Sequence, residues 1–134
     1  PEEARLRRLA PPEVEFLGHL GDRELREQYR GCRAVLMPGV EDFGSVPLEA
    51  MACGRPAIVY GAGGGPESVE PGRTGLVFTE PTAEGLRAAV ATLSSRPFDR
   101  LALRARAEAH RREVFESRVR DFVDRALAGG VSRC

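Results

Sequence analysis

The chain has 134 residues, of which 42% are hydrophobic and 30% are charged. This length is typical of one folded domain, and the composition excludes an intrinsically disordered segment. The 20 basic and 20 acidic residues give a formal net charge of zero, which removes the electrostatic argument for binding nucleic acid or an anionic membrane.

Amphipathic spacing, apolar runs and Pro or Gly boundaries divide the chain into alternating helices and strands. In chain order they predict a helix over 2–9, a strand over 14–18, a helix over 22–31, a strand over 34–38, a helix over 46–53, a strand over 56–60, a glycine loop over 61–65, a helical turn over 66–70, a strand over 74–78, a helix capped by Thr82, and helices near 99–114 and 117–128. This alternation predicts one α/β domain over 1–134, with a Rossmann-like parallel sheet and flanking helices. Four strands are few for such a sheet, and the chain begins at Pro1 rather than Met. We therefore expect a domain truncated at its N-terminus.

The assignment makes three specific predictions about helix caps, strand burial and the last helix. Asp22 is expected to cap its helix, with Leu25 and Tyr29 one turn apart on the inner face. The apolar run 34–38 is typical of a strand covered on both faces. The last helix has an apolar stripe, which either packs on this domain or belongs against a partner outside the chain. The stripe consists of Val119, Phe122, Val123 and Ala126.

The three cysteines, Cys32, Cys53 and Cys134, are an odd number and lack C-x-x-C spacing. Cys32 and Cys53 have apolar neighbours, and free cysteines there pack as small hydrophobic residues. No apolar run approaches the about 18 residues of a membrane span, and no signal peptide is visible. We therefore expect a reduced, cytoplasmic protein.

The segment 41–49, EDFGSVPLE, follows a predicted buried strand and opens a helix. Ligands of open α/β sheets bind at the carboxyl ends of strands. A helix start offers unpaired N–H groups and the positive end of a dipole, which both suit phosphate. Gly44 permits a close backbone approach, and Pro47 in the first turn costs no helical hydrogen bond. The segment therefore predicts a phosphate-binding turn.

Glu49 has apolar neighbours in the sequence, which predicts a buried carboxylate. Because an unpaired buried carboxylate is costly, it needs a strong hydrogen-bonding partner. Ser45 is not a capping-box partner, since it precedes Glu49 by four residues rather than three. A ribose diol would serve, at about 1.5–3 kcal/mol for each charge-assisted bond. A partner within the protein is an equally open alternative.

Glu41 and Asp42 precede the turn, and their residue types alone allow several roles. Acids before a helix often serve only as favourable caps for its dipole. Carboxylate pairs also perform glycoside hydrolysis. Because one acid precedes the turn and Glu49 follows it, we favour a pair that holds two ends of one ligand.

The segment 61–67, GAGGGPE, also follows a strand, so we expect it beside the first segment at the same sheet edge. Its glycines either approach a phosphate or sugar or form a flexible turn. It is not the dinucleotide fingerprint G-x-G-x-x-G, because Pro66 occupies the last glycine position. We expect His19, after the strand 14–18, near this edge and a structural role for His110. No metal site can be assembled from these residues.

Taken together, these segments resemble the donor-binding half of glycosyltransferase family 4, a family of retaining enzymes with the GT-B fold. The motifs that carry the resemblance lie in order between about residues 14 and 94: Glu41-x7-Glu49 with its internal Phe43-Gly44, EAMACGRPAI (49–58), GGGPESV (63–69) and GRTGLVF (72–78). The combination of EDFG, VPLEAMACGRP and YGAGG is most similar to mannosyltransferase-type members that use GDP-mannose.

The resemblance implies a role for each matching residue. Glu41 would be catalytic, contacting the hydroxyls of the donor sugar, and Glu49 would accept hydrogen bonds from the nucleotide ribose. The amides that would hold the diphosphate and sugar are those of Phe43, Gly44, Ser45 and Val46. The residues that would line the sugar side are Gly63, Gly64 and Glu67. The residues that would contact the base are Leu17, Gly18 and His19.

The resemblance also implies a reaction and a missing half. A hexosyl group would pass from a nucleotide-sugar donor, with GDP-mannose favoured over a UDP-sugar, to an acceptor hydroxyl without a cofactor or metal. The Arg/Lys pair for the diphosphate and the N-terminal acceptor domain would lie outside this chain, so the fragment alone would be inactive. Any peripheral membrane association would occur through that missing half. The residues alone leave two alternatives: a non-catalytic nucleotide-binding or regulatory Rossmann-like module, and an NAD(P)-binding domain.

Overall fold

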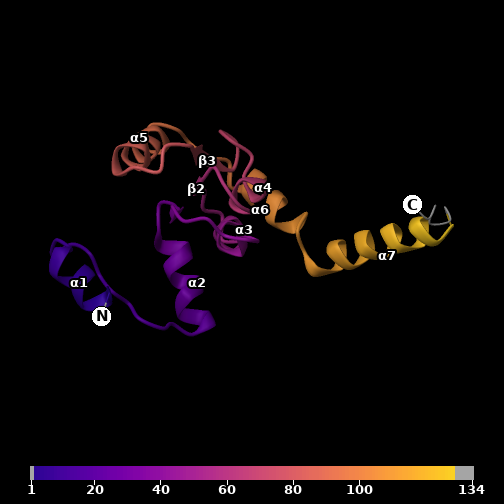
Figure 1. The fold of residues 1–134 in the computed structure, drawn as a ribbon, viewed down its shortest axis with the longest axis horizontal. Helices are drawn as coiled ribbons and strands as arrows, with labels where there is room; N and C mark the ends of the chain where they lie inside the picture. Colours follow the sequence, from indigo (N-terminus) through magenta and orange to yellow (C-terminus); the bar gives the residue numbers. More distant parts are fainter. Residues whose placement is uncertain (1, 129–134) are drawn as a thin grey trace, which may run out of the picture.

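The computed structural model describes residues 2–128 and forms an α/β fold, drawn as a ribbon in Figure 1. Its strands are β1 (Val35–Met37), β2 (Ala57–Tyr60) and β3 (Gly75–Phe78). Its helices are α1 (Glu2–Leu9), α2 (Asp22–Gly31), α3 (Ser45–Ala52), α4 (Gly65–Ser68), α5 (Ala83–Ser94), α6 (Arg100–Glu108) and α7 (Arg112–Ala128). Most predicted elements are confirmed to within a residue or two.

The strands form one parallel sheet in the order β1-β2-β3. Val35 pairs with Ala57, and Ala57 pairs in turn with Gly75. Each connection runs from the carboxyl end of one strand through a helix to the next strand. The sequence-based expectation of an α/β class with a parallel sheet and flanking helices is therefore confirmed.

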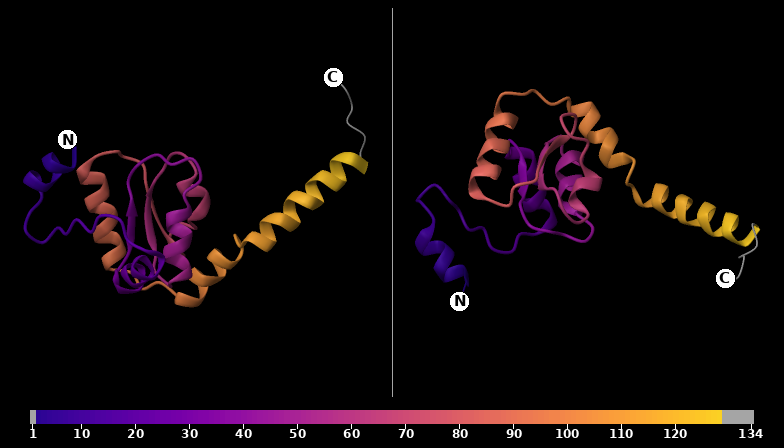
Figure 2. Two further views of the ribbon diagram at one scale, coloured as in Figure 1. Left: turned by 90° about the horizontal axis from the view of Figure 1, so that it is seen from below. Right: turned by 45° about the horizontal axis from the view of Figure 1, so that its top comes forward.

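Helices cover both faces of this sheet, as the two views of Figure 2 show. Successive residues of a strand point to opposite faces. Ala57 and Val59 of β2 therefore pack with Met51 of α3 and Leu103 of α6. Ile58 packs on the other side with a cluster formed mainly by β3 and α5, which includes Phe78 and Leu93. The core is thus a three-layer arrangement, with α3 and α6 on one side and α5 on the other.

The predicted strand at 14–18 is wrong, because these residues form an exposed irregular segment between α1 and α2. Val14 and Leu17 are both about half exposed, and no described segment pairs with them in a β-ladder. A strand needs a neighbour that satisfies its backbone hydrogen-bonding groups. The apolar pattern of 14–18 could not reveal that such a neighbour is lacking among residues 2–128.

The expectation that 34–38 is covered on both faces is only half correct. Met37 is buried against α3, but Leu36 on the α5 side is 47% exposed. Within residues 2–128, β1 pairs with β2 alone and is therefore an edge strand. Its outer edge leaves backbone groups unpaired, as edge strands do.

The predicted helix boundaries are partly confirmed. The Thr82 hydroxyl accepts a hydrogen bond from the Gly85 amide, 3.0 Å away, and so caps α5 as expected. Asp22, by contrast, is the first residue of α2 rather than its cap. Gly21 occupies the cap position, and its N–H donates to the Glu24 carboxylate at 3.0 Å. The Glu24 side chain therefore satisfies the N-terminal backbone of α2 in place of the expected Asp22 cap.

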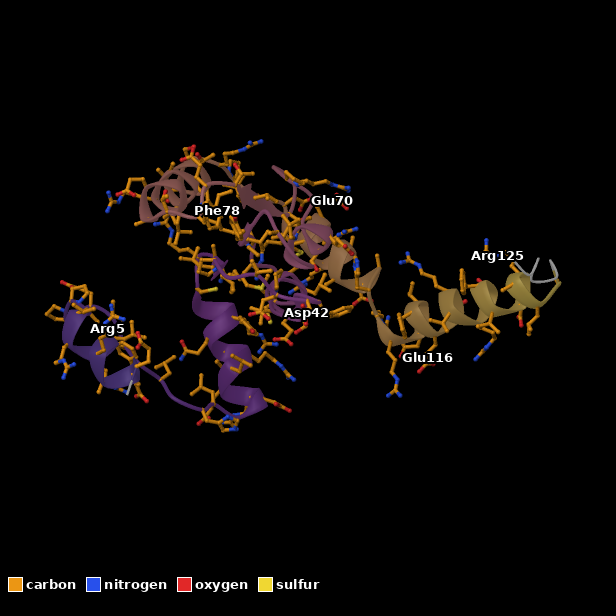
Figure 3. All side chains as sticks on the ribbon, in the orientation of Figure 1. Arg5, Asp42, Glu70, Phe78, Glu116 and Arg125 are labelled. Atoms are coloured by element: carbon orange, nitrogen blue, oxygen red, sulfur yellow. The ribbon has the colours of Figure 1, made fainter. Side chains whose placement is uncertain are left out.

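The last two helices divide earlier than the sequence predicted, and α7 stands apart from the core. A turn at 109–111 separates α6 from α7, so His110 lies between helices rather than within one. Glu116 and Arg125 of α7 lie away from the sheet (Figure 3), whereas Phe115 near the start of α7 lines a cleft together with Phe43. None of the described residues of α7 is buried. No helix among residues 2–128 is long and apolar enough to cross a membrane.

Candidate functional site

The turn before α3 adopts the conformation that its glycine allows. Gly44 is the N-cap of α3, with φ 69° and ψ 52°, in the left-handed region that side chains disfavour. No side chain caps this helix, and among the described residues neither Ser45 nor Val46 donates a backbone hydrogen bond to another group. Pro47 carries no N–H at all. The amides of Ser45 and Val46 are therefore available to an anion at the positive end of α3.

Two loops that follow neighbouring strands are joined through their backbones. Glu41, after β1, forms an isolated parallel bridge with Gly63, after β2. The Gly64 N–H donates to the Glu41 carbonyl at 2.6 Å. A Cβ at Gly63 or Gly64 would overlap the carbonyl oxygen of Glu41 or Asp42 respectively. The expected proximity of the two segments is confirmed, and the close approach that these glycines permit is between two parts of the chain.

The turn leaves a cleft of about 370 Å³, which we call the turn cleft. It is lined by Met37, Glu41, Asp42, Phe43, Gly44, Ser45 and Val46. Figure 3 labels Asp42 beside α3. The Phe43 side chain is 71% exposed. The structure thus brings together Glu41 and all four residues whose amides were expected to hold a diphosphate.

The expectation that Glu49 is buried is wrong, because its side chain is exposed. Glu49 nevertheless has a partner: the Tyr29 hydroxyl of α2 donates to its Oε2 at 2.8 Å. The apolar neighbours of Glu49 in sequence pack on α3's other sides, where Ala50 and Met51 are fully buried. Residue pattern alone could not show which side of so short a helix meets solvent.

Glu49 and Tyr29 face a second cleft, of about 340 Å³, between α2 and α3. This α2–α3 cleft is lined by Asp22, Leu25, Arg26, Tyr29, Glu49, Ala52 and Cys53. Residues four apart on a helix lie on the same side of it, so Glu49 lies one turn beyond Ser45. One side of α3 therefore borders both clefts.

Two groups near this cleft have altered acidity. Burial, together with the hydrogen bond to Glu49 and its charge, raises the pKa of Tyr29 to about 12. Burial also raises the pKa of the Cys32 thiol, although Arg55 opposes this. Cys32 and Cys53 are free thiols, whereas Cys134 lies outside the described residues. Both the phenol and the Cys32 thiol are therefore held in their protonated, uncharged forms at neutral pH.

A contact from α6 that no sequence pattern predicted holds the end of α4. Arg106 of α6 donates to the carbonyl of Ser68 at 3.1 Å and also to the carbonyl of Glu67. The buried Ser68 hydroxyl donates to the Gly44 carbonyl at 3.3 Å. Arg106 thus holds the end of α4, which in turn contacts the turn before α3. The distance of 38 residues between Arg106 and Ser68 left no local signal of this contact.

The remaining predicted residues lie outside the two clefts. Gly18 and His19 are exposed in the segment before α2, and their expected place at the sheet edge depended on the strand that is not formed. The Glu67 side chain is exposed on α4. Gly63 and Gly64 support the turn from behind rather than lining its cleft. Among residues 2–128, no cluster of His, Cys, Asp or Glu could hold a metal ion.

This arrangement can hold an elongated anionic ligand. The open amides of α3 would receive a central phosphate group, with Glu41 on one side of the turn and Glu49 one helical turn further on. Carboxylates accept hydrogen bonds from sugar hydroxyls. A ligand with hydroxyls at both ends and phosphates between them therefore matches the chemistry of these groups.

Comparison with known sequences gives matches over most of the chain. Residues 2–112 match the family described as Glycosyl transferases group 1. A D-inositol 3-phosphate glycosyltransferase from Actinosynnema mirum is 37% identical over 100 residues, which cover 74% of this chain and 24% of that protein. A GDP-mannose-dependent monoacylated alpha-(1-6)-phosphatidylinositol monomannoside mannosyltransferase from Corynebacterium glutamicum is 36% identical over 119 residues, covering 81% of this chain and 31% of that protein.

Solved structures give the same picture. Sucrose-phosphate synthase from Thermosynechococcus elongatus superimposes with a TM-score of 0.74 and 25% identity, over 96% of this chain and 34% of that one. The Anabaena protein Alr3699/HepE in complex with UDP superimposes with a TM-score of 0.65 and 26% identity, over 96% of this chain and 36% of that one. The chain therefore spans about a quarter to a third of the length of these proteins.

Proposed function

Because the chain belongs to the group 1 glycosyl transferase family, we propose that it forms the donor-binding part of a retaining glycosyltransferase with the GT-B fold. The parent protein transfers a hexosyl group from a nucleotide-sugar to an acceptor hydroxyl. The observation that carries this proposal is the pair of joined loops at the ends of β1 and β2. They place Glu41 beside an uncapped helix start in one cleft.

The diphosphate of the donor binds at the start of α3. The amides of Ser45 and Val46 are open there, and the helix dipole favours negative charge. These fixed donors also stabilise charge on the departing diphosphate, as preorganised dipoles do in other transferases. The amides of Phe43 and Gly44 complete the same turn, which is held by the Ser68 hydroxyl.

The two glutamates recognise the sugars at either end of the donor. Glu41 contacts hydroxyls of the transferred sugar in the turn cleft, and Glu49 accepts from the ribose hydroxyls in the α2–α3 cleft. Gly63, Gly64 and Glu67 border the sugar side in this proposal, where Gly63 and Gly64 contact Glu41 and the Glu67 N–H donates to the Gly64 carbonyl. Gly18 and His19 would reach the base only after the segment before α2 moves, because it now lies outside both clefts.

We propose GDP-mannose as the donor, ahead of a UDP-sugar. Support comes from the C. glutamicum relative, whose name specifies dependence on GDP-mannose. The Anabaena structure contains UDP, which makes a UDP-sugar the alternative to be tested beside it. Both donors contain the diphosphate proposed to bind at the start of α3 and the ribose proposed to bind Glu49.

The acceptor is bound by another part of the parent protein in this proposal. The chain spans about a quarter to a third of its relatives' length, which leaves room for an acceptor domain and for basic residues at the diphosphate. The isolated chain then binds donor without catalysing transfer, and any membrane association belongs to that other part. We also propose a cytoplasmic location, supported by the free thiols of Cys32 and Cys53.

The test is a calorimetric titration of the chain with GDP, UDP, GDP-mannose and NAD, repeated with Glu49→Gln. We expect the guanine nucleotides to bind most tightly, and Glu49→Gln to weaken GDP about 10–100-fold, because a charged acceptor is lost. Glu84→Gln is the matched control, since Glu84 is exposed in the first turn of α5 on the opposite face of the sheet. Tighter binding of NAD, or equal binding by Glu49→Gln and the wild type, would contradict the proposal.

A further inference from the structure

The hydrogen bond between Tyr29 and Glu49 is unusual within this structure. Most other hydrogen bonds between two side chains among residues 2–128 join residues three or four apart. The bond from Tyr29 to Glu49 spans 20 residues and connects α2 with α3. It also ends on the carboxylate that faces the α2–α3 cleft. A glutamate on an open surface would normally be free to sample many side-chain conformations.

We propose that Tyr29 is a positioning residue that holds the Glu49 carboxylate ready for the ribose hydroxyls of the donor. This inference rests on the proposed function, because it needs Glu49 to bind the ribose. Tyr29 occupies Oε2 of Glu49 at 2.8 Å, and Oε1 together with the second lone pair of Oε2 stays open to the ligand. Fixing the side chain before binding removes an entropy cost that the donor would otherwise have to offset.

The surroundings of Tyr29 are suited to this task. Its hydroxyl is protonated across the physiological range, because burial and Glu49 raise its pKa to about 12, so it remains a donor. Its backbone carbonyl accepts from the Cys32 thiol at 3.3 Å. Arg55, which follows α3, donates to the carbonyl of Arg30 in the last turn of α2. The end of α2 that bears Tyr29 is therefore fastened to the segment that bears Glu49.

A purely structural role for Tyr29 predicts a different result. If the bond only held α2 against α3, its loss would weaken every ligand of the cleft to the same extent. A positioning role affects only ligands that carry ribose hydroxyls. Comparing a nucleotide with its 2′,3′-dideoxy counterpart therefore separates the two roles.

The experiment measures the affinities of GDP, UDP and their 2′,3′-dideoxy forms by calorimetry for the wild type, Tyr29→Phe, Glu49→Gln and the double variant. We expect Tyr29→Phe to weaken the ribonucleotides about 3–10-fold, which corresponds to the ordering of one side chain. The dideoxy forms should bind Tyr29→Phe and the wild type alike. The double variant should resemble Glu49→Gln, since Tyr29 acts through that carboxylate. Tyr60→Phe is the matched control, because Tyr60 is the other tyrosine and packs on Phe78 away from α2.

Two results would overturn the inference, and they differ in what else they overturn. If wild type and Glu49→Gln bind the ribonucleotides and dideoxy forms equally well, Glu49 does not bind ribose, and the proposed role of Glu49 fails together with that of Tyr29. If the wild type distinguishes the two forms and Tyr29→Phe does so to the same degree, only the role of Tyr29 fails. An equal loss for both forms, with a lowered melting temperature, would identify the bond as structural and also overturn the inference.

Discussion

At the scale of single residues, the contact between Gly63 and Glu41 imposes the strictest requirement on the site. Gly63 has a φ of 74°, and a Cβ there would overlap the Glu41 carbonyl oxygen. We expect Gly63→Ala to lower the free energy of unfolding by about 2 kcal/mol or more, since left-handed strain and a backbone clash add together. Urea denaturation measures this through the transition midpoint.

Gly39→Ala is the control for that substitution. A Cβ at Gly39 would meet no atom within 4 Å, and Gly39 has no positive φ. Its unfolding free energy should change by no more than about 0.5 kcal/mol, as for most surface substitutions. Equal midpoints for Gly63→Ala and Gly39→Ala would mean that the two loops are not held together as described.

Residue patterns predicted where the residues of the candidate site lie along the fold, but not their solvent exposure or their side-chain partners. The positions of Gly44, of the open helix start after it and of the loop at Gly63 followed from spacing along the chain, because parallel strands place their carboxyl ends at one edge. The exposure of Glu49 did not follow, since on a short and almost wholly apolar helix the side that meets solvent depends on tertiary packing. Tyr29 was assigned to the inner face of α2, but its bond to Glu49 depends on how two helices meet.

At the scale of secondary-structure elements, the short helix α4 depends on α6 for its position. Arg106 donates to the carbonyls of Ser68 and Glu67 at the end of α4. We expect Arg106→Met to keep the packing of the side-chain stem but lose these bonds and the ion pair with Glu70 at 3.5 Å. The predicted loss is about 1–3 kcal/mol of stability, because hydrogen bonds from charged donors are among the stronger ones. Faster amide exchange at residues 65–69 would show that the loss is centred on α4.

Arg104→Met is the matched control for this element. Arg104 also belongs to α6 but is exposed, and it takes part in none of the side-chain bonds described above. It should leave both the unfolding midpoint and the exchange of α4 unchanged. If Arg104→Met lost a similar amount of stability, the effect of Arg106→Met would come from the helix propensity or charge of α6 rather than from the contact with α4.

Elements with clear local signals were predicted well, except where the partner that an element needs is not among the described residues. Thr82 and the periodic apolar residues after it defined α5 without reference to the rest of the fold. The run 14–18 has an equally good strand pattern, but no described segment pairs with it. The division at 109–111 was misplaced because alanine and arginine favour helix on both sides of it. The hydrophobic pattern shows which secondary structure a segment can form, but a strand also needs a neighbouring strand to pair with.

At the scale of the whole molecule, the core and the apolar surface are distributed unevenly. The fully buried residues, including Met51, Ile58 and Leu103, surround the sheet between α3, α5 and α6. Large apolar side chains are also exposed along α7, among them Phe122 and Leu127. The sequence had predicted the stripe on this helix and left open whether it packs on the domain. Figure 1 answers that question, because α7 extends away from the sheet.

This distribution predicts that α7 contributes little to the stability of the core. None of its described residues is buried, and elements with few buried contacts open at little cost in free energy. Removing residues 112–134 should therefore change the unfolding free energy of the remainder by less than about 1 kcal/mol.

Sedimentation velocity should show less self-association of the shortened chain at high concentration, because exposed apolar patches promote contacts between molecules. Phe122→Glu in the full chain is the matched variant, since Phe122 is 68% exposed, and it should reduce self-association without shortening the chain. A loss of several kcal/mol on removing α7 would instead show that the helix folds back onto the core in solution.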